Sequence, residues 1–215
     1  KMHSSLAVAE QGLPLGVLRT DIYASHFDAQ DSAQSRPIEQ KESYRWLRTV
    51  EDLAEISKWV AETQLIAVGD RESDLFELFD YRRRKARNIH LLVRAHYNRC
   101  LRDESAKLFD HLEALPVMGE AQIEVPRQRE KKGKPSKPGP IGLPARKARV
   151  QLRWGKVTVA APATAQTRHL PAAELYSLLI VEPHPLKGAK ALRWVLLTTV
   201  PIESRKQALR CLRWY

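Results

Sequence analysis

A strand, a turn and a helix follow one another without interruption between residues 65 and 86. Residues 65–69 form the short apolar run Leu-Ile-Ala-Val-Gly, which ends at Asp70. The apolar face of a helix over residues 73–86 follows, at Leu75, Phe76, Leu78 and Phe79. Residues 89–93 form a second apolar run with β-branched character. Because a crossover of this size joins two parallel strands, residues 65–94 predict a strand-helix-strand unit.

Two further elements precede this unit. Residues 3–10 and 15–24 alternate between apolar and polar side chains and flank a turn at Gly12 and Pro14, which predicts a β-hairpin. A polar loop is expected over residues 25–40. Apolar residues then recur at three- and four-residue steps over residues 43–63, as an amphipathic helix requires. We expect the hairpin and the strand-helix-strand unit to share one mixed sheet.

The second half of the chain is expected to be rich in short strands. A helix over residues 103–115 is followed by strands at 121–125, 149–153, 156–160, 178–181 and 194–200, which we interpret as an antiparallel insertion. A last amphipathic helix over residues 204–215 follows Pro201, with Glu203 or Ser204 as its cap. The predicted fold class is α/β: a mixed sheet flanked by helices, with an antiparallel β-rich insertion.

The charge balance favours a polyanionic partner. The chain has 36 Lys and Arg against 25 Asp and Glu, a formal net charge of +11 and a pI near 9.8. Basic residues crowd around glycines and prolines in a predicted flexible loop at residues 127–149, among them Lys131, Lys132, Arg146 and Lys147. Such a loop binds phosphates without base specificity, although charged loops are often only solvated.

Several classes of protein are disfavoured. The apolar runs are far shorter than the ~20 residues that span a bilayer, so no membrane partner is expected. The chain has two cysteines, Cys100 and Cys211. Because they form no Cys-x-x-Cys pair, they suggest neither a disulfide framework nor a zinc site. A reducing cytoplasm fits this composition. Because the chain begins at Lys1 and shows no apolar signal segment, we expect a fragment of a longer protein.

Asp70 is the principal candidate for chemistry. It lies at the predicted carboxyl end of a buried strand, where open α/β sheets place functional groups. One interpretation is that Asp70 caps the following helix. For Asp74, a capping role alone is expected. The other is that Asp70 binds Mg²⁺ or Mn²⁺, which prefer carboxylate and water oxygens. Position alone does not separate these interpretations, and one carboxylate is too few for a complete metal site.

The order of elements, together with several motifs, resembles the RNase H-like core of bacterial insertion-sequence DDE transposases. It is closest to the hairpin-forming cut-and-paste group, and the resemblance runs through most of the chain. The motifs that carry it are Lys-Glu-Ser at 41–43, Val-Gly-Asp-Arg-Glu-Ser-Asp at 68–74, Leu-Leu-Val-Arg at 91–94, Pro-Ala-Arg-Lys-Ala at 144–148, Leu-Arg-Trp-Val-Leu-Leu-Thr at 192–198, Pro-Ile-Glu-Ser at 201–204 and Gln-Ala-Leu-Arg at 207–210.

The resemblance implies a catalytic site of three acidic residues, of which Asp70 matches the second. The first would lie on a strand before Lys1, and the third on a helix after Tyr215, which resembles the tyrosine opening a Tyr, Arg, Glu, Lys motif. Residues 1–98 would then be an RNase H-like catalytic core lacking its first strand, residues 99–203 the insertion and residues 204–215 the start of the returning helix. Such a fragment is expected to be inactive alone.

The implied reaction is phosphoryl transfer with two Mg²⁺ or Mn²⁺ ions in the complete site. The complete protein would nick transposon ends, form and reopen DNA hairpins, and join the 3′-hydroxyl ends to target DNA. Trp194 matches the family residue that holds a base displaced from the stack. Its alternative is a core tryptophan on a strand.

Further DNA contacts are expected from the positions of other basic residues. Arg71 and Arg94 are placed to grip phosphate, with surface ion pairs as the alternative. The chain departs from the family at His96 and Asn98, where a basic residue and a proline are expected, but it retains Arg99. The predicted DNA-contacting residues are Arg71, Arg94, His96, Arg99, Lys131, Lys132, Arg146, Lys147, Trp194 and Tyr215.

The implied partners are double-stranded DNA, as transposon ends and target, and a second copy in a homodimer on DNA. The implied location is the bacterial cytoplasm, at the nucleoid. One alternative is a non-catalytic DNA-binding or inhibitory transposase remnant, which the flanking reading frame would distinguish. A nuclease of the same fold that cleaves but never joins strands is a third, disfavoured by Trp194 and the Tyr215 region.

Overall fold

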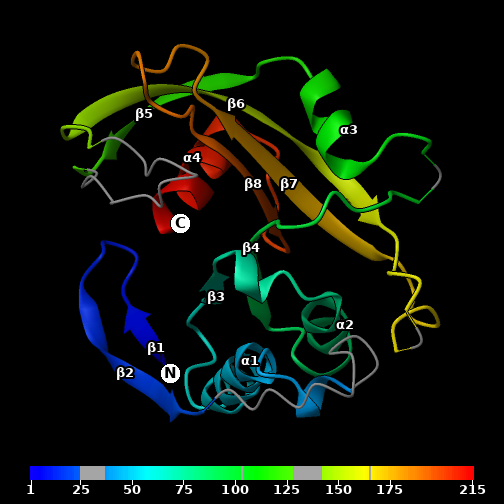
Figure 1. Cartoon of the computed structure of the whole chain (residues 1–215). Coiled ribbons are helices and arrows are strands. Elements are labelled where there is room, and N and C mark those ends of the chain that lie inside the picture. Colours follow the sequence, from blue (N-terminus) through cyan, green and yellow to red (C-terminus); the bar gives the residue numbers. More distant parts are fainter. Residues whose placement is uncertain (25–36, 103, 128–141, 165) are drawn as a thin grey trace.

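A mixed, curved sheet of six strands forms the centre of the described structure, as the sequence predicts for an α/β chain (Figure 1). This computed structural model describes residues 1–24, 37–102, 104–127, 142–164 and 166–215. The strand order is β3-β4-β8-β7-β6-β5, in which β3 and β4 are parallel and all other neighbours are antiparallel. The strands are β3 (Leu65–Gly69), β4 (Ile89–Arg94), β5 (Gly119–Val125), β6 (Arg146–Val159), β7 (Ala173–Val181) and β8 (Arg193–Thr198).

The predicted strand-helix-strand unit is confirmed. Strands β3 and β4 pair from Leu65 opposite Ile89 to Gly69 opposite Val93, and α2 (Phe76–Lys85) connects them. This helix begins later than the periodicity suggests, because a short 3₁₀ turn, Arg71–Ser73, and an extended Leu75 come first. The carboxyl ends of both strands therefore lie at the same edge of the sheet.

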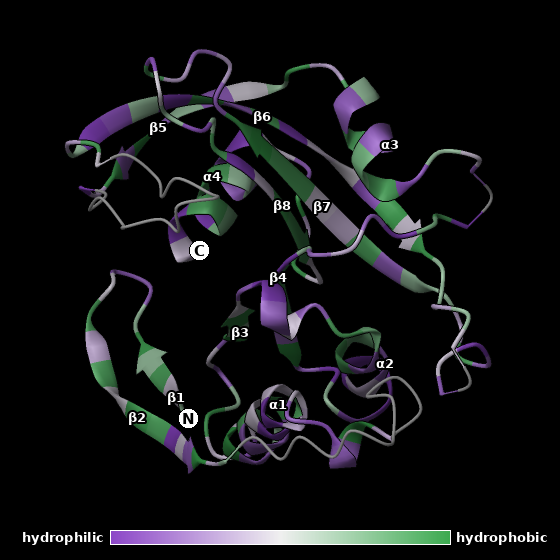
Figure 2. Ribbon diagram, viewed as in Figure 1, coloured by the Kyte–Doolittle hydropathy of each residue, from purple (hydrophilic) through white to green (hydrophobic). Residues whose placement is uncertain are grey.

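Each face of the sheet carries its own apolar core, as the alternation of side chains along a strand requires. On one face, Leu91 and Val93 pack with residues of α1 (Tyr44–Ile56), α2 and α3 (Leu108–Ala114). On the other, Leu92 and Leu196 pack with α4 (Arg205–Trp214). Figure 2 shows the apolar colour running along the central strands. The sheet is thus covered by helices on both faces.

The N-terminal hairpin forms as predicted but does not join the mixed sheet, so the expectation of a shared sheet is wrong. Strands β1 (Met2–Val8) and β2 (Pro14–Ile22) make a separate two-stranded sheet. Polar side chains attach it to α1: the Ser5 and Thr49 hydroxyls lie 2.8 Å apart, and Arg19 Nη2 donates to Asp52 Oδ1 at 2.7 Å. Its other side exposes apolar residues, namely Met2, Leu6, Val8, Leu15, Val17 and Ile22.

The strands of the predicted insertion are antiparallel to one another, as expected, and belong to the central sheet. Strand β8 lies between β4 and β7, so β4 is hydrogen-bonded to a strand about a hundred residues later in the chain. The two strands predicted at residues 149–153 and 156–160 are one long strand, β6, because Gly155 keeps its place in the ladder opposite Ser177. The proposed boundary near residue 98 therefore crosses a continuous sheet.

Several element boundaries differ from the sequence-based ones for local reasons. Helix α3 begins at Leu108 instead of residue 103, because Lys107 pairs with Cys100 in a β-bridge. Helix α1 ends at Ile56, well before residue 63. Helix α4 is capped by Ser204, one of the two predicted caps, whose Oγ accepts from the Gln207 amide at 3.4 Å. Among the described residues, no helix combines the length and apolarity needed to cross a membrane.

Candidate functional site

Asp70 occupies the turn directly after β3, at the carboxyl edge of the sheet. Its Oδ1 accepts a hydrogen bond from the Glu72 amide at 2.9 Å, and its carbonyl accepts from the Ser73 amide and hydroxyl at 3.1 and 2.7 Å. The capping interpretation is therefore confirmed, although the capped element is a 3₁₀ turn. A carboxylate has about four acceptor sites, and this side chain belongs to an exposed residue, so capping leaves it able to bind a cation.

The glycine before Asp70 is required by close packing. A Cβ at Gly69 would lie 2.2 Å from Ser73 Oγ, 2.6 Å from Ser73 Cβ and 3.2 Å from the Trp46 ring. The first two distances are far below van der Waals contact and involve a short, hydrogen-bonded side chain. Gly69 thus lets Ser73 fold back against β3 and hold the Asp70 carbonyl, which fixes where the carboxylate begins.

A divalent metal at Asp70 would find few ligands among the described residues. Glu72, the nearest acidic neighbour in sequence, is paired with Arg45. Within the described ranges, no three His, Cys, Asp or Glu side chains gather closely enough to hold a metal ion. Asp70 can therefore contribute one oxygen ligand, and we derive no catalytic step from a metal at this position.

Three of the predicted DNA-contacting residues meet in space. Arg94 ends β4, Trp194 lies in β8 and Tyr215 follows α4. The Arg94 guanidinium carbon lies 5.8 Å from the centroid of the Trp194 ring, and its Nη1 is 3.5 Å from the Tyr215 hydroxyl. The Trp194 and Tyr215 rings meet edge to face, with centroids 5.5 Å apart. All three are half-buried, so part of each side chain reaches solvent.

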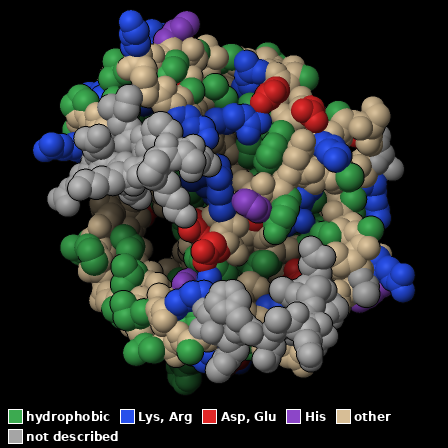
Figure 3. All heavy atoms as spheres, viewed as in Figure 1, with side chains coloured by type: hydrophobic (Ala, Val, Ile, Leu, Met, Phe, Trp, Pro, Cys, Tyr) green, Lys and Arg blue, Asp and Glu red, His purple; other side chains and the backbone are tan. Residues whose placement is uncertain are grey.

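This aromatic and guanidinium cluster, Arg94, Trp194 and Tyr215, lies at the same edge of the sheet as Asp70. Gly69 is paired with Val93, so Asp70 and Arg94 are the next residues along two adjacent parallel strands. Figure 3 shows basic side chains gathered beside acidic ones near the middle of the face shown, in the region between β3 and α4 of Figure 1. The edge thus combines negative, positive and aromatic groups.

Asp74 does not cap a helix, so that prediction is wrong. Its side chain is 0% exposed, and it accepts hydrogen bonds from the Arg99 guanidinium at 2.6 and 3.2 Å and from the His96 and Tyr97 amides at 2.7 and 3.0 Å. Arg99, predicted to contact DNA, is buried in this pair. The Asp74 and Arg99 pair instead fixes the backbone that follows β4, from which the exposed His96 projects.

The predicted basic contacts in the insertion divide into three groups. Arg146 forms two hydrogen bonds to Glu182 with both side chains under a tenth exposed, and these bonds raise the pKa of Arg146 and lower that of Glu182. Lys147 is exposed, as is Arg71 in the turn after Asp70. Lys131 and Lys132 lie outside the described residues. Arg71 and Lys147 thus stay available to a ligand, whereas Arg146 is occupied.

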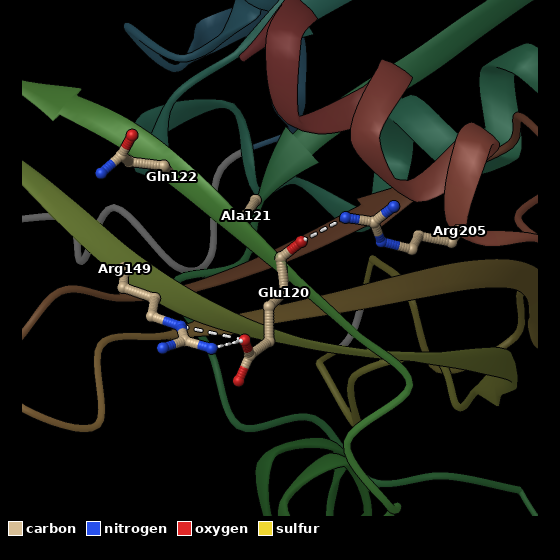
Figure 4. Close-up of a pocket in the computed structure, with 5 residues that line it drawn as sticks. All are labelled: Glu120, Ala121, Gln122, Arg149 and Arg205. Carbon is tan, nitrogen blue, oxygen red and sulfur yellow. Dashed lines mark hydrogen bonds and ion pairs between the residues drawn. The ribbon is translucent and has the colours of Figure 1, made fainter.

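A shallow pocket between β5, β6 and α4 is lined by residues that contact one another (Figure 4). The Arg205 guanidinium donates to the Glu120 carbonyl at 2.9 Å, and Arg149 Nε donates to a Glu120 carboxylate oxygen at 2.9 Å. The sticks in Figure 4 show both arginines directed at the same glutamate. The first contact attaches α4 to β5 at the edge of the sheet and the second joins β6 to β5, so we assign this pocket a structural role.

A comparison of the sequence with known protein families finds none that matches. The assignments at the sheet edge therefore depend on the residues themselves and on their arrangement. The strongest of these is the convergence of Arg94, Trp194 and Tyr215 beside Asp70.

Proposed function

We propose that this chain is the central part of a DDE transposase catalytic domain with an RNase H-like core. The complete protein would cut transposon ends by metal-dependent phosphodiester hydrolysis, form hairpins and join 3′-hydroxyl ends to target DNA. The observation that carries the proposal is the meeting of Arg94, Trp194 and Tyr215 at the edge where Asp70 lies. Its partners would be double-stranded DNA and, on paired transposon ends, a second copy of the chain.

The cluster is suited to bent DNA. Making a hairpin requires a sharply turned backbone, which displaces a base from the stack. An indole ring can stack on such a base, and a guanidinium beside it can contact the adjacent phosphate. Trp194 is half-buried, with an arginine and a tyrosine as neighbours. Trp194 also packs against the apolar core beneath α4, so the part of its ring that reaches solvent would be the part that binds a base.

Asp70 would supply one ligand to Mg²⁺ or Mn²⁺ in the complete site. Such ions activate a water or hydroxyl nucleophile and stabilise the leaving oxygen. Other residues position the backbone of this site. Gly69 and Ser73 fix the backbone that carries the Asp70 side chain, and the pair of Asp74 and Arg99 fixes the segment after β4. Arg71 and Arg94 would bind phosphates of the DNA end.

The test uses the protein extended by its flanking reading frame, labelled transposon-end duplex and Mg²⁺. We expect Asp70→Ala to abolish nicking, because a metal ligand is lost, whereas Glu62→Ala removes an exposed carboxylate elsewhere and serves as the matched control. Trp194→Ala should leave nicking in place and selectively reduce hairpins, and Trp194→Phe should restore part of the loss, because an aromatic face remains.

Two outcomes would contradict the proposal. Nicking that survives in Asp70→Ala would show that this carboxylate only caps its turn. Duplex binding without any nicking by the extended wild-type protein, with Mg²⁺ or Mn²⁺, would instead favour the DNA-binding or inhibitory remnant. In that case stop codons in the flanking frame would be expected as well.

A further inference from the structure

A run of positive charge lies at the C-terminal end of α2, far from the edge that holds Asp70. Five of the six residues at positions 82–87 are Arg or Lys. They precede β4, whose last residue is Arg94, so the strand separates this run from the cluster around Trp194. Five steps along a strand at ~3.3 Å each give a separation of roughly 16 Å. The run is thus a separate surface.

The charges in this run are held in place but only partly neutralised. Asp80, with a side chain 4% exposed, accepts from Arg83 at 2.8 Å and from Arg84 at 2.6 Å, and both guanidinium groups stay about half exposed. Although burial acts to raise the pKa of Asp80, the two arginines lower it overall. One carboxylate therefore balances two guanidinium groups, which leaves one net positive charge on the trio.

The other basic side chains in the run donate to uncharged carbonyls or extend into solvent. Arg82 donates to the carbonyls of Ile89 and Arg87 at 2.9 and 3.0 Å, and Arg87 donates to that of Arg83 at 2.9 Å. Lys85 is exposed. Because a carbonyl carries no net charge, these contacts orient the guanidinium groups without removing their positive charge.

An exposed tryptophan lies next to this run. Trp59, in the turn after α1, is 87% exposed, which is unusual for the largest apolar side chain. Asn88 Nδ2 donates to Ser57 Oγ at 2.5 Å, and this bond connects the turn to the residues that follow α2. Trp59 lies two residues after Ser57, and Arg87 lies one residue before Asn88. The turn that holds Trp59 and the residue that directly follows the basic run are thus in direct contact.

We propose that this surface, formed by Trp59 and the basic residues at 82–87, binds single-stranded nucleic acid. Trp59 would stack on one base, and the basic side chains would contact phosphates on either side of it. Stacking is sequence-tolerant because every base has a flat π face, whereas a duplex hides these faces between its base pairs. The inference goes beyond the proposed function and does not depend on it, since it involves none of the residues at the Asp70 edge.

The test measures fluorescence anisotropy of a labelled short oligothymidylate with the full chain. Trp59→Ala should weaken binding by roughly 5- to 150-fold, the range for losing one stacked base, and Trp59→Phe should weaken it less. Lys85→Gln should weaken binding and reduce the slope of log affinity against log salt by about 0.7, the value for one phosphate contact on a single strand. Lys187→Gln, which removes another exposed lysine, should change neither.

Equal affinity of wild-type and Trp59→Ala for the oligothymidylate would overturn the proposal. It would also fail if Lys85→Gln and Lys187→Gln weakened binding equally, because the charge effect would then not be local. Tighter binding to phosphatidylserine vesicles than to the oligonucleotide, lost in Trp59→Ala, would assign the surface to lipid instead. Both Trp59 and Lys85 are exposed, so unchanged far-ultraviolet circular dichroism is expected for every variant.

Discussion

The buried pair of Asp74 and Arg99 gives the sharpest test of how the carboxyl edge of the sheet is built. In Asp74→Asn the carboxylate becomes an amide, whose NH₂ group must face either the His96 and Tyr97 amides or the Arg99 guanidinium. All of these are donors, so at least one pair of hydrogen bonds is lost. Arg99, 7% exposed on its side chain, is left as a buried charge without its counter-ion.

The expected cost follows from this geometry. Removing one partner of a buried, hydrogen-bonded ion pair destabilises a protein by about 3–5 kcal/mol. In a chain of this size, each kcal/mol lowers the melting temperature by about 2–4 °C. We therefore expect Asp74→Asn to reduce the melting temperature by roughly 6–20 °C and to lower the urea midpoint without changing the m-value.

The matched control is the exposed pair of Glu120 and Arg149, with side chains 43% and 77% exposed. Glu120→Gln should change the free energy of unfolding by less than about 1 kcal/mol, because water screens surface pairs. Urea unfolding followed by circular dichroism measures both variants. A loss below about 1 kcal/mol in Asp74→Asn would refute the argument that this pair fixes the segment after β4.

Three further predictions concern other parts of the chain. Hydrogen bonds from Arg146 lower the pKa of Glu182 from its ordinary 4.5, so the pair stabilises the fold above about pH 4.5 and loses this contribution as the pH falls through the lowered pKa. The urea midpoint of Glu182→Gln should therefore depend less on pH below about 4.5 than that of the wild type, and an equal dependence would refute the stabilising role of the pair. Cys100 is exposed, whereas burial raises the pKa of the Cys211 thiol to about 11, so a thiol reagent should modify Cys100 first, and mass spectrometry of the folded chain checks the order. Leu6→Lys, on the exposed apolar side of the hairpin, should reduce binding of a hydrophobic dye with little change in the urea midpoint. Undiminished dye binding would show that the dye does not bind to this side of the hairpin.

Local features of the fold were predictable from sequence, and long-range ones were not. The unit from β3 to β4 follows from apolar runs and helical periodicity within thirty residues, and the cap at Ser204 follows from its side chain. The place of β8 beside β4 depends on pairing between residues far apart, such as Thr198 and Leu92, which no local pattern encodes. The hairpin was assigned to the wrong sheet for the same reason.

At the candidate site, too, local features were predictable from sequence and contacts between distant residues were not. Asp70 was chosen as a candidate because a carboxylate after an apolar run is a local pattern. The strand before it was expected to be buried, but β3 lies at the edge of the sheet and exposes Val68. Asp74, four residues later, was misassigned as a cap because its partner Arg99 is distant in sequence. The proximity of Trp194 and Tyr215 depends on where α4 packs, and the sequence alone offered no register for it. The metal and DNA assignments stay predictions.

The position of β8 inside the sheet has a consequence during synthesis. Strand β4 is complete at Arg94, but its second neighbour is not made until Thr198, about a hundred residues later. At roughly 5–20 residues per second, translation takes about 5–20 s to supply it. Throughout that interval one edge of β4 is open to pairing with other nascent chains. We therefore expect recovery of native protein in a cell to depend strongly on translation rate and on chaperones that cover this edge.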